Sequence, residues 1–257
     1  MMILPIGDDN TDRTTTPIVN YLLIIANVLV FVFLQGLGGN DRFTYAFATV
    51  PQEIVTGEDL VTADQLLRDP LSGARFTMPG LQPTPISVYV TLLTSMFMHG
   101  SLAHLGGNML YLWIFGDNLE NSLGHRRYLL FYLLCGVLAS LAHVTTTVFF
   151  GSNPMIPSLG ASGAISGVLG GYLLLFPQRR VTVILVRIIT QVPAIVAVGL
   201  WFIFQLISGA GVLGAGAQEG GVAYAAHIGG FIAGFLLVKL FALGRDVDSR
   251  SYRRYRY

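Results

Sequence analysis

Residues 128–150 read YLLFYLLCGVLASLAHVTTTVFF, a run of 23 residues without aspartate, glutamate, lysine or arginine. A helix that crosses the hydrocarbon core of a bilayer needs about 17 to 25 mostly apolar residues, and this run has that length. The whole chain agrees, because 53% of its residues are hydrophobic and 11% are charged, against roughly 25% charged residues in soluble domains. The sequence therefore predicts a multi-pass membrane protein of the all-α class.

Further apolar runs lie on both sides of this one. The six predicted crossings are residues 17–35, 101–119, 128–150, 161–176, a stretch within 181–207, and 223–242. In the fifth, Arg187 and Pro193 indicate that its first part lies at the membrane interface, before the crossing itself. The predicted membrane domain is therefore 17–243, between an N-terminal segment 1–16 and a basic tail 244–257.

Basic residues in short connections indicate the orientation of such helices, because they collect on the cytoplasmic side. Arginines follow the second, fourth and sixth predicted crossings: Arg126, Arg127, Arg179, Arg180, Arg245, Arg250, Arg253, Arg254 and Arg256. With six crossings these places share one side, so both termini are predicted to be cytoplasmic. The long connection at about 36–98 then faces outward, and its apolar end at 88–98 is expected to lie partly embedded at the outer surface.

Polar residues stand near the start of the second, fourth and sixth predicted crossings. They are His104 with Asn108, then Ser162, then His227. These three crossings run in the same direction, so at a rise of 1.5 Å per residue the groups should lie within roughly 10 Å of one another in depth. Polar residues inside a membrane usually mark function. We therefore expect one layer of converging polar groups below the outer surface.

Small residues recur once per turn in the two helices that carry Ser162 and His227. They are Gly163, Gly167 and Gly171 in the fourth crossing, and Ala226, Gly230 and Gly234 in the sixth. Such stripes let helix backbones approach closely in lipid. A serine nucleophile and its histidine base must come within about 2.6 to 3.2 Å of each other. The combination favours a reactive Ser162–His227 pair.

Each of these features also has an interpretation without catalysis. Ser162 alone is compatible with helix capping, and His227 with core packing or a proton relay. His104 and Asn108 are compatible with hydrogen bonding between helices, and the glycines with packing alone. A structural role is expected for His143. Glu120 is expected to pair with one of the arginines that follow it, Arg126 or Arg127.

Metal and nucleic-acid binding find no support in the sequence. His99 and His104 are five positions apart, and no cysteine or carboxylate stands beside them. Metal sites in proteins usually combine several such ligands. The net charge is +1, which gives no indication of a nucleic-acid partner. No metal, cofactor or nucleic acid is therefore predicted.

Three motifs in this chain resemble those of a known family. HGSLAHLGGN at 99–108, GASG at 160–163 and AHIGGFIAG at 226–234 are similar to the HxxxxHxxxN, GxSG and AHxxGxxxG motifs of the rhomboid intramembrane serine proteases. The opening ILPIGDDN at 3–10 looks like that of a bacterial member. The resemblance covers nearly the whole chain, most densely 96–234, and the three motifs occur in the family's order.

The resemblance implies a catalytic dyad of Ser162 and His227 without an aspartate. It implies an oxyanion hole formed by His104, Asn108 and the backbone N–H of Ser162. Supporting positions would be His99, Gly160, Gly163, Gly230 and Gly234. Substrates would be transmembrane proteins, cleaved near the outer face of a lipid bilayer, here expected to be the bacterial inner membrane.

The chain departs from the family pattern at two places. An aromatic residue often stands four positions after the nucleophile, where it packs on the catalytic histidine, and here that position is Ser166. Some members also carry a Trp-Arg pair in the first outer loop, which this chain lacks. The sequence therefore does not indicate which group orients His227.

Two other classes of function remain open. A non-catalytic rhomboid-like protein that binds membrane clients would usually lack the serine or the histidine, and this chain has both Ser162 and His227. A transporter or channel would need polar groups at several depths, whereas the inner halves of the three crossings are almost wholly apolar. The sequence predicts no oligomeric state.

Overall fold

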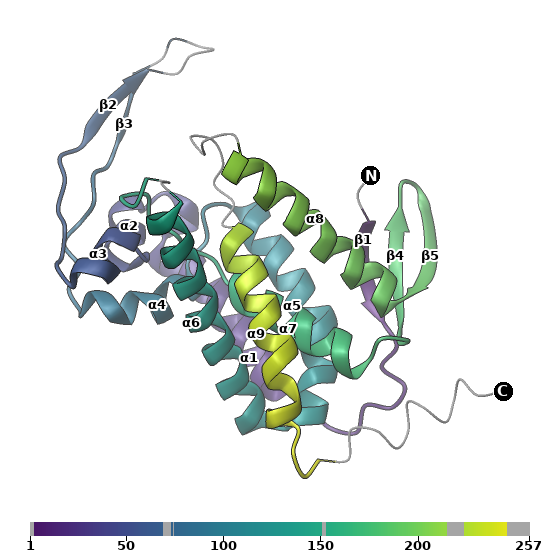
Figure 1. Cartoon of the computed structure of the whole chain (residues 1–257). Coiled ribbons are helices and arrows are strands. Elements are labelled where there is room, and N and C mark those ends of the chain that lie inside the picture. The colour runs from purple at the N-terminus through teal and green to yellow at the C-terminus, as the bar shows by residue number, and fades with distance from the viewer. Residues whose placement is uncertain (1–2, 69–72, 74, 151–152, 215–223, 246–257) are drawn as a thin grey trace.

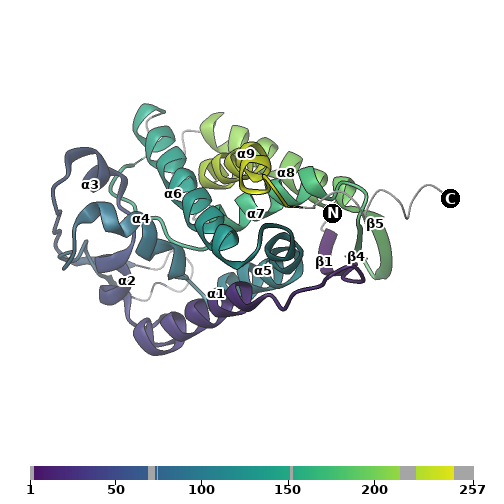
Figure 2. The same ribbon diagram turned by 90° about the horizontal axis from the view of Figure 1, so that it is seen from below.

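The computed structural model describes residues 3–68, 73, 75–150, 153–214 and 224–245. Its long helices pack side by side in one bundle (Figures 1 and 2). They are α1 (Ile18–Leu29, continued by a π-helical turn Val30–Leu34), α5 (Leu102–Leu123), α6 (His125–Phe149), α7 (Ser162–Leu175), α8 (Ala194–Gly214) and α9 (Tyr224–Phe241). In the described part of the chain, α6, α8 and α9 are long and apolar enough to cross a membrane.

The long connection between α1 and α5 contains short elements of its own. They are a 3₁₀ turn (Gly36–Gly38), α2 (Asp41–Phe47), α3 (Pro51–Thr56), the hairpin of β2 (Gln65–Arg68) and β3 (Arg75–Met78), a 3₁₀ turn (Val88–Val90), α4 (Thr91–Thr94) and a 3₁₀ turn (Ser95–Phe97). The helices of this connection lie on one side of the bundle, next to α6 (Figure 1). The apolar segment at the end of the connection, residues 88–98, thus forms only short helical turns.

The prediction of an all-α chain is wrong for the segments on the opposite side of the bundle. There β1 (Ile3–Asp8), β4 (Arg180–Leu185) and β5 (Ile188–Pro193) form an antiparallel sheet in the order β1-β4-β5 (Figure 2). The first part of the predicted fifth crossing is therefore a hairpin, and α8 begins directly after it. Valine, isoleucine and threonine dominate both strands of this hairpin, and such β-branched residues favour strands.

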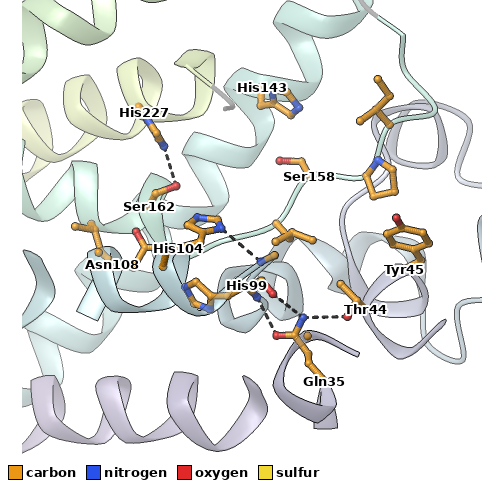
Figure 3. A pocket seen from close by; sticks show the side chains of 18 of the residues that line it. Gln35, Thr44, Tyr45, His99, His104, Asn108, His143, Ser158, Ser162 and His227 are labelled. Carbon is orange, nitrogen blue, oxygen red and sulfur yellow. Dashed lines mark hydrogen bonds between the residues drawn. The ribbon is translucent and has the colours of Figure 1, made fainter. Parts of the chain in front are cut away.

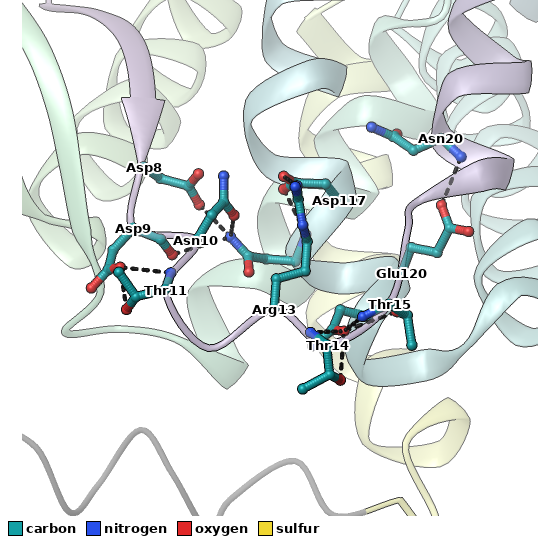
Figure 4. Close-up of polar contacts among 12 residues, drawn as sticks. Asp8, Asp9, Asn10, Thr11, Arg13, Thr14, Thr15, Asn20, Asp117 and Glu120 are labelled. Carbon is teal, nitrogen blue, oxygen red and sulfur yellow. Dashed lines mark hydrogen bonds and ion pairs between the residues drawn. The ribbon is translucent and has the colours of Figure 1, made fainter.

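Polar contacts join the N-terminal segment to the C-terminal end of α5 (Figure 4) and to residues at and just after the C-terminal end of α7. Oδ2 of Asp8 accepts hydrogen bonds from Asn118 at 2.7 Å and from the Tyr172 hydroxyl at 2.6 Å. Arg179 donates to Asn118 and to Asp12, each at 2.6 Å. Burial outweighs these hydrogen bonds and raises the pKa of Asp8 to about 7. Segment 1–16 is thus, where described, part of the folded structure.

Glu120 caps α1, so the predicted pairing with Arg126 or Arg127 is wrong. Its two carboxylate oxygens accept hydrogen bonds from two backbone N–H groups in the first turn of α1, at 2.9 and 2.7 Å. Its side chain is fully buried and also contacts Nδ1 of His125. The first N–H groups of a helix lack partners within the helix, and a carboxylate there satisfies them and faces the positive end of the helix dipole.

The stripes of small residues lie where α7 meets α9. A Cβ atom on Gly230 would overlap the backbone carbonyl oxygen of Gly163, and one on Gly234 would overlap that of Gly167. On its other side, a Cβ on Gly163 would lie 2.7 Å from the Cβ of Ala139 in α6. Backbone atoms cannot move aside as a flexible side chain can. The two helices can therefore be this close only while these positions are glycine.

The variant Gly230→Ala should lower the stability of the bundle. The added methyl group must push α9 away from α7, and such overpacking typically costs about 1 to 3 kcal/mol. The matched control is Gly199→Ala in α8, where a Cβ would meet nothing within 4 Å. The control should unfold at the temperature of the unsubstituted chain or slightly above it. Equal unfolding temperatures for both variants in detergent would contradict this account of the helix contact.

Candidate active site

A cavity of about 850 Å³ lies at the N-terminal ends of α5, α7 and α9 (Figure 3). Its lining includes Gln35, Thr44, His99, His104, Asn108, His143, Ser162, Trp201 and His227. The four polar residues that the sequence placed in one layer, one pair in α5 and one residue each in α7 and α9, all line this cavity. The structure thus brings them together at one end of the bundle.

Ser162 and His227 are in direct contact. Ser162 is the first residue of α7, and its Oγ lies 2.8 Å from Nε2 of His227 in α9 (Figure 3). The N-cap of α7 is Ala161, which makes no side-chain capping bond. The Ser162 hydroxyl is thus not needed as a helix cap, and it hydrogen-bonds the imidazole of His227 instead. The distance falls within the range required between a serine nucleophile and its base.

Gly160 lies in the turn that leads into α7. Gly160 has φ +122°, a backbone conformation that favours glycine. A Cβ at this position would lie 2.9 Å from Cε1 of His104 and 3.7 Å from Oγ of Ser162. The backbone N–H of Gly160 donates to the carbonyl oxygen of Ser95 at 2.9 Å. The absent side chain thus leaves room for the His104 ring next to the hydroxyl.

His104 and Asn108 occupy successive turns of α5, on the face that lines the cavity. The backbone N–H of His104 is fixed by the hydroxyl of Ser101, the N-cap residue, at 3.0 Å. The side chain of Asn108 is 8% exposed, and its Nδ2 has no hydrogen-bond partner among the described residues. Buried donors in proteins almost always have a partner, so this amide is available to a water molecule or a ligand in the cavity.

His99 is held through its backbone and packs against His104. The Gln35 side chain accepts a hydrogen bond from the His99 N–H at 2.9 Å and donates to the His99 carbonyl at 3.0 Å. The two imidazole rings meet edge to face, 5.1 Å apart. Burial, and next the His104 ring, lower the pKa of His99 to about 3, so its ring is neutral near pH 7. Across the described ranges, no three side chains of metal-binding type come together.

Sequence reasoning missed two residues of α8 that contact His227. Oε1 of Gln205 lies 2.8 Å from Nδ1 of His227, and the ring of Trp201 lies 6.1 Å from the imidazole ring, centroid to centroid. Ser166 instead donates to the carbonyl oxygen of Ser162 at 2.6 Å. A signal was present, because Gln205 is the one amide side chain in the apolar sequence of α8. His143 of α6, for which we expected a structural role, also lines the cavity.

Comparison with known proteins places this site within a family. A model of the rhomboid domain matches residues 87–243. Rhomboid protein 1, mitochondrial, of Saccharomyces cerevisiae is 33% identical over 174 residues, which are 68% of this chain and 47% of that protein. Rhomboid protease GluP of Bacillus subtilis is 33% identical over 152 residues, 59% of this chain and 26% of that protein.

A third relative is the human presenilin-associated rhomboid-like protein, mitochondrial, which is 33% identical over 123 residues, 44% of this chain and 32% of that protein. This chain thus spans less than half the length of each of these relatives. The matched domain nevertheless covers more than half of this chain and includes His99 to His227, the motif residues that line the cavity. The chain therefore belongs to the rhomboid family.

Proposed function

We propose that this chain is an intramembrane serine endopeptidase, with Ser162 as the nucleophile and His227 as the general base. The observation that carries the proposal is the 2.8 Å contact between Oγ of Ser162 and Nε2 of His227. It joins two helices of a rhomboid domain within a cavity that further polar residues, among them His104 and Asn108, also line. An isolated serine or histidine has structural explanations, but a bonded pair in such a cavity has the geometry of acyl transfer.

The proposed reaction has two stages. Ser162 attacks a peptide carbonyl while His227 takes its proton and then passes it to the leaving amine, which yields an acyl-enzyme. Water, activated by the same imidazole, hydrolyses this intermediate. The 850 Å³ cavity extends from the Ser162–His227 pair to residues of the long connection between α1 and α5. It offers the path by which water reaches a serine inside the bilayer.

Negative charge that develops on the carbonyl oxygen needs hydrogen-bond donors. We assign this role to the side chains of His104 and Asn108 and to the backbone N–H of Ser162. The free Nδ2 of Asn108 supports the assignment, since a donor kept without a partner is ready for the oxyanion. The position of Ser162 at the N-terminus of α7 adds the positive end of the helix dipole.

Ser162→Ala and His227→Ala should each abolish cleavage of a tagged protein with one transmembrane helix in liposomes. Removal of either member of a serine–histidine pair typically lowers kcat by about 10⁴-fold or more. The matched control is Ser122→Ala at the other end of α5, where the hydroxyl bonds a backbone carbonyl of its own helix. The control should cleave as the unsubstituted chain does. Equal cleavage by Ser162→Ala would remove the proposal.

His104→Ala and Asn108→Ala should each lower kcat by about 10²- to 10³-fold, the usual effect of losing one oxyanion donor. Both side chains line the cavity, so truncating them enlarges an existing hollow, and the unfolding temperature should change little. Initial rates on the same substrate, with thermal unfolding in parallel, measure both quantities. Rates that stay at the unsubstituted value would reject the oxyanion role of these two residues.

The proposed topology has six crossings, membrane domain 17–243 and cytoplasmic termini, in the inner membrane of a bacterial cell. The six long helices support this count. α7 has only 14 residues, but its residues from Gly163 to Tyr172 are buried, so neighbouring helices shield it from lipid. Of the predicted basic tail, residues 246–257 lie outside the described residues. The substrates would be transmembrane proteins with small or helix-weakening residues at the cleaved bond near the outer face.

Cysteine labelling in intact cells tests the orientation. Glu58→Cys in the long connection and Gln178→Cys after α7 both place a thiol at an exposed position. A membrane-impermeant maleimide should label Glu58→Cys at once and Gln178→Cys only after the cells are permeabilised. The unsubstituted chain is the control, because its single cysteine, Cys135, is buried in α6. The reverse order of labelling would overturn the orientation.

A further inference from the structure

Gln205 stands out as a buried polar side chain in the apolar helix α8. Its neighbours Phe204 and Leu206 are 60% and 42% exposed, whereas Gln205 is 5% exposed. Its side chain turns inward, and Oε1 lies 2.8 Å from Nδ1 of His227, a residue 22 positions later in the chain. An amide without a partner in an apolar environment costs several kcal/mol. The bond to His227 therefore decides which face of α8 is turned toward α9.

The hydrogen bond from His227 to Gln205 selects one tautomer of the imidazole. A carbonyl oxygen has no hydrogen to donate, so Nδ1 must carry the proton. Nε2 is then unprotonated, and its lone pair can accept the hydroxyl hydrogen of Ser162, 2.8 Å away. When Nε2 takes up that proton, Nδ1 keeps its own, so the bond to Gln205 persists through the reaction.

The packing of α8 on α9 keeps Gln205 in register with His227. Trp201 and Gly209 lie one turn before and one turn after Gln205, so the three share a face of α8. The ring of Trp201 lies 6.3 Å from that of Phe231, one turn after His227. A Cβ on Gly209 would lie 3.2 Å from the Cβ of Tyr224, in the turn before His227. Packing contacts one turn before and one turn after Gln205 thus fix the position of its amide along α9.

We propose that Gln205 is a positioning residue for catalysis, which holds His227 in the tautomer and orientation that deprotonate Ser162. The inference rests on the proposed protease function. It assigns to α8 the orienting task that Ser166 cannot perform, because the Ser166 hydroxyl bonds the carbonyl oxygen of Ser162. The hydrogen bonds of His227 in the described part of the chain go to Ser162 and Gln205.

The neutral amide of Gln205 differs from a carboxylate in its effect on the charge of His227. A carboxylate beside Nδ1 would stabilise the imidazolium ion, most strongly in a site of low dielectric. Gln205 accepts the same hydrogen bond without adding charge. The other titratable side chains that face His227 are His104 of α5, His143 of α6 and Tyr224 of α9. None of these three is acidic near pH 7, so among the described residues a carboxylate introduced at position 205 would be the one acidic group facing His227.

The test compares Gln205→Leu and Gln205→Glu with a matched control, Gln191→Leu, an exposed glutamine in β5. Gln205→Leu removes the acceptor and should lower kcat by about tenfold or more while KM changes little. The rate at which a fluorophosphonate probe labels Ser162 should fall by a similar factor, because that step needs the base but no substrate binding. Gln205→Glu restores an acceptor oxygen and should recover most of kcat at high pH, with the acid limb of the pH–rate profile moved to higher pH. The control should match the unsubstituted chain.

The outcomes separate this inference from the proposed function. If the unsubstituted chain neither cleaves a substrate nor reacts with the probe, the protease proposal fails, and this inference fails with it. If that chain is active and Gln205→Leu equals it in kcat and labelling rate, only the role of Gln205 is overturned. Should Gln205→Leu fail to fold in detergent, Gln205→Glu decides, since an acid limb that stays in place would overturn the positioning role.

Discussion

Backbone contact between α7 and α9 is the constraint on which the geometry of the site depends. Ser162 and His227 are short or rigid side chains on different helices, and a hydrogen bond between them tolerates only a few tenths of an ångström. At Gly230 a single methyl group would meet the carbonyl oxygen of Gly163, one residue after Ser162. α6 supports the contact from the other side through Ala139. Packing at glycine positions thus sets the distance between Oγ of Ser162 and Nε2 of His227.

The two ends of α5 and α7 differ in how their polar groups are satisfied. At the C-terminal ends, Glu120 accepts hydrogen bonds from two backbone N–H groups of α1, and the hydroxyl of Tyr172 donates to Asp8. At the N-terminal ends, Nδ2 of Asn108 has no hydrogen-bond partner within the part of the chain that the structure describes, and it shares a cavity with the Ser162 hydroxyl and the imidazoles of His104 and His227. Buried polar groups cost free energy unless they are paired. The Asn108 amide is therefore available to a ligand that brings an acceptor oxygen into the cavity.

Hydropathy predicted the positions of five of the six long helices within a few residues, and the spacing of polar residues grouped His104, Asn108, Ser162 and His227. Both signals are local and periodic, so a single sequence contains them. The strands β1 and β4 were missed because they pair residues far apart in the chain, such as Leu4 with Ile184. Gln205 was missed for a similar reason. Its single amide marks it as unusual within α8, but its partner is set by how α8 packs against α9, which the local sequence does not specify.

Attachment of the N-terminal strand has a mechanical consequence for the bundle. Residues from Asp8 to Asn20 bind the C-terminal ends of α5 and α7, through Asn118, Glu120, Tyr172 and Arg179. The opposite ends of the same helices surround a hollow. The N-terminal segment thus ties α5 to α7 at the ends remote from this hollow, so their relative position there does not depend on the residues that line it.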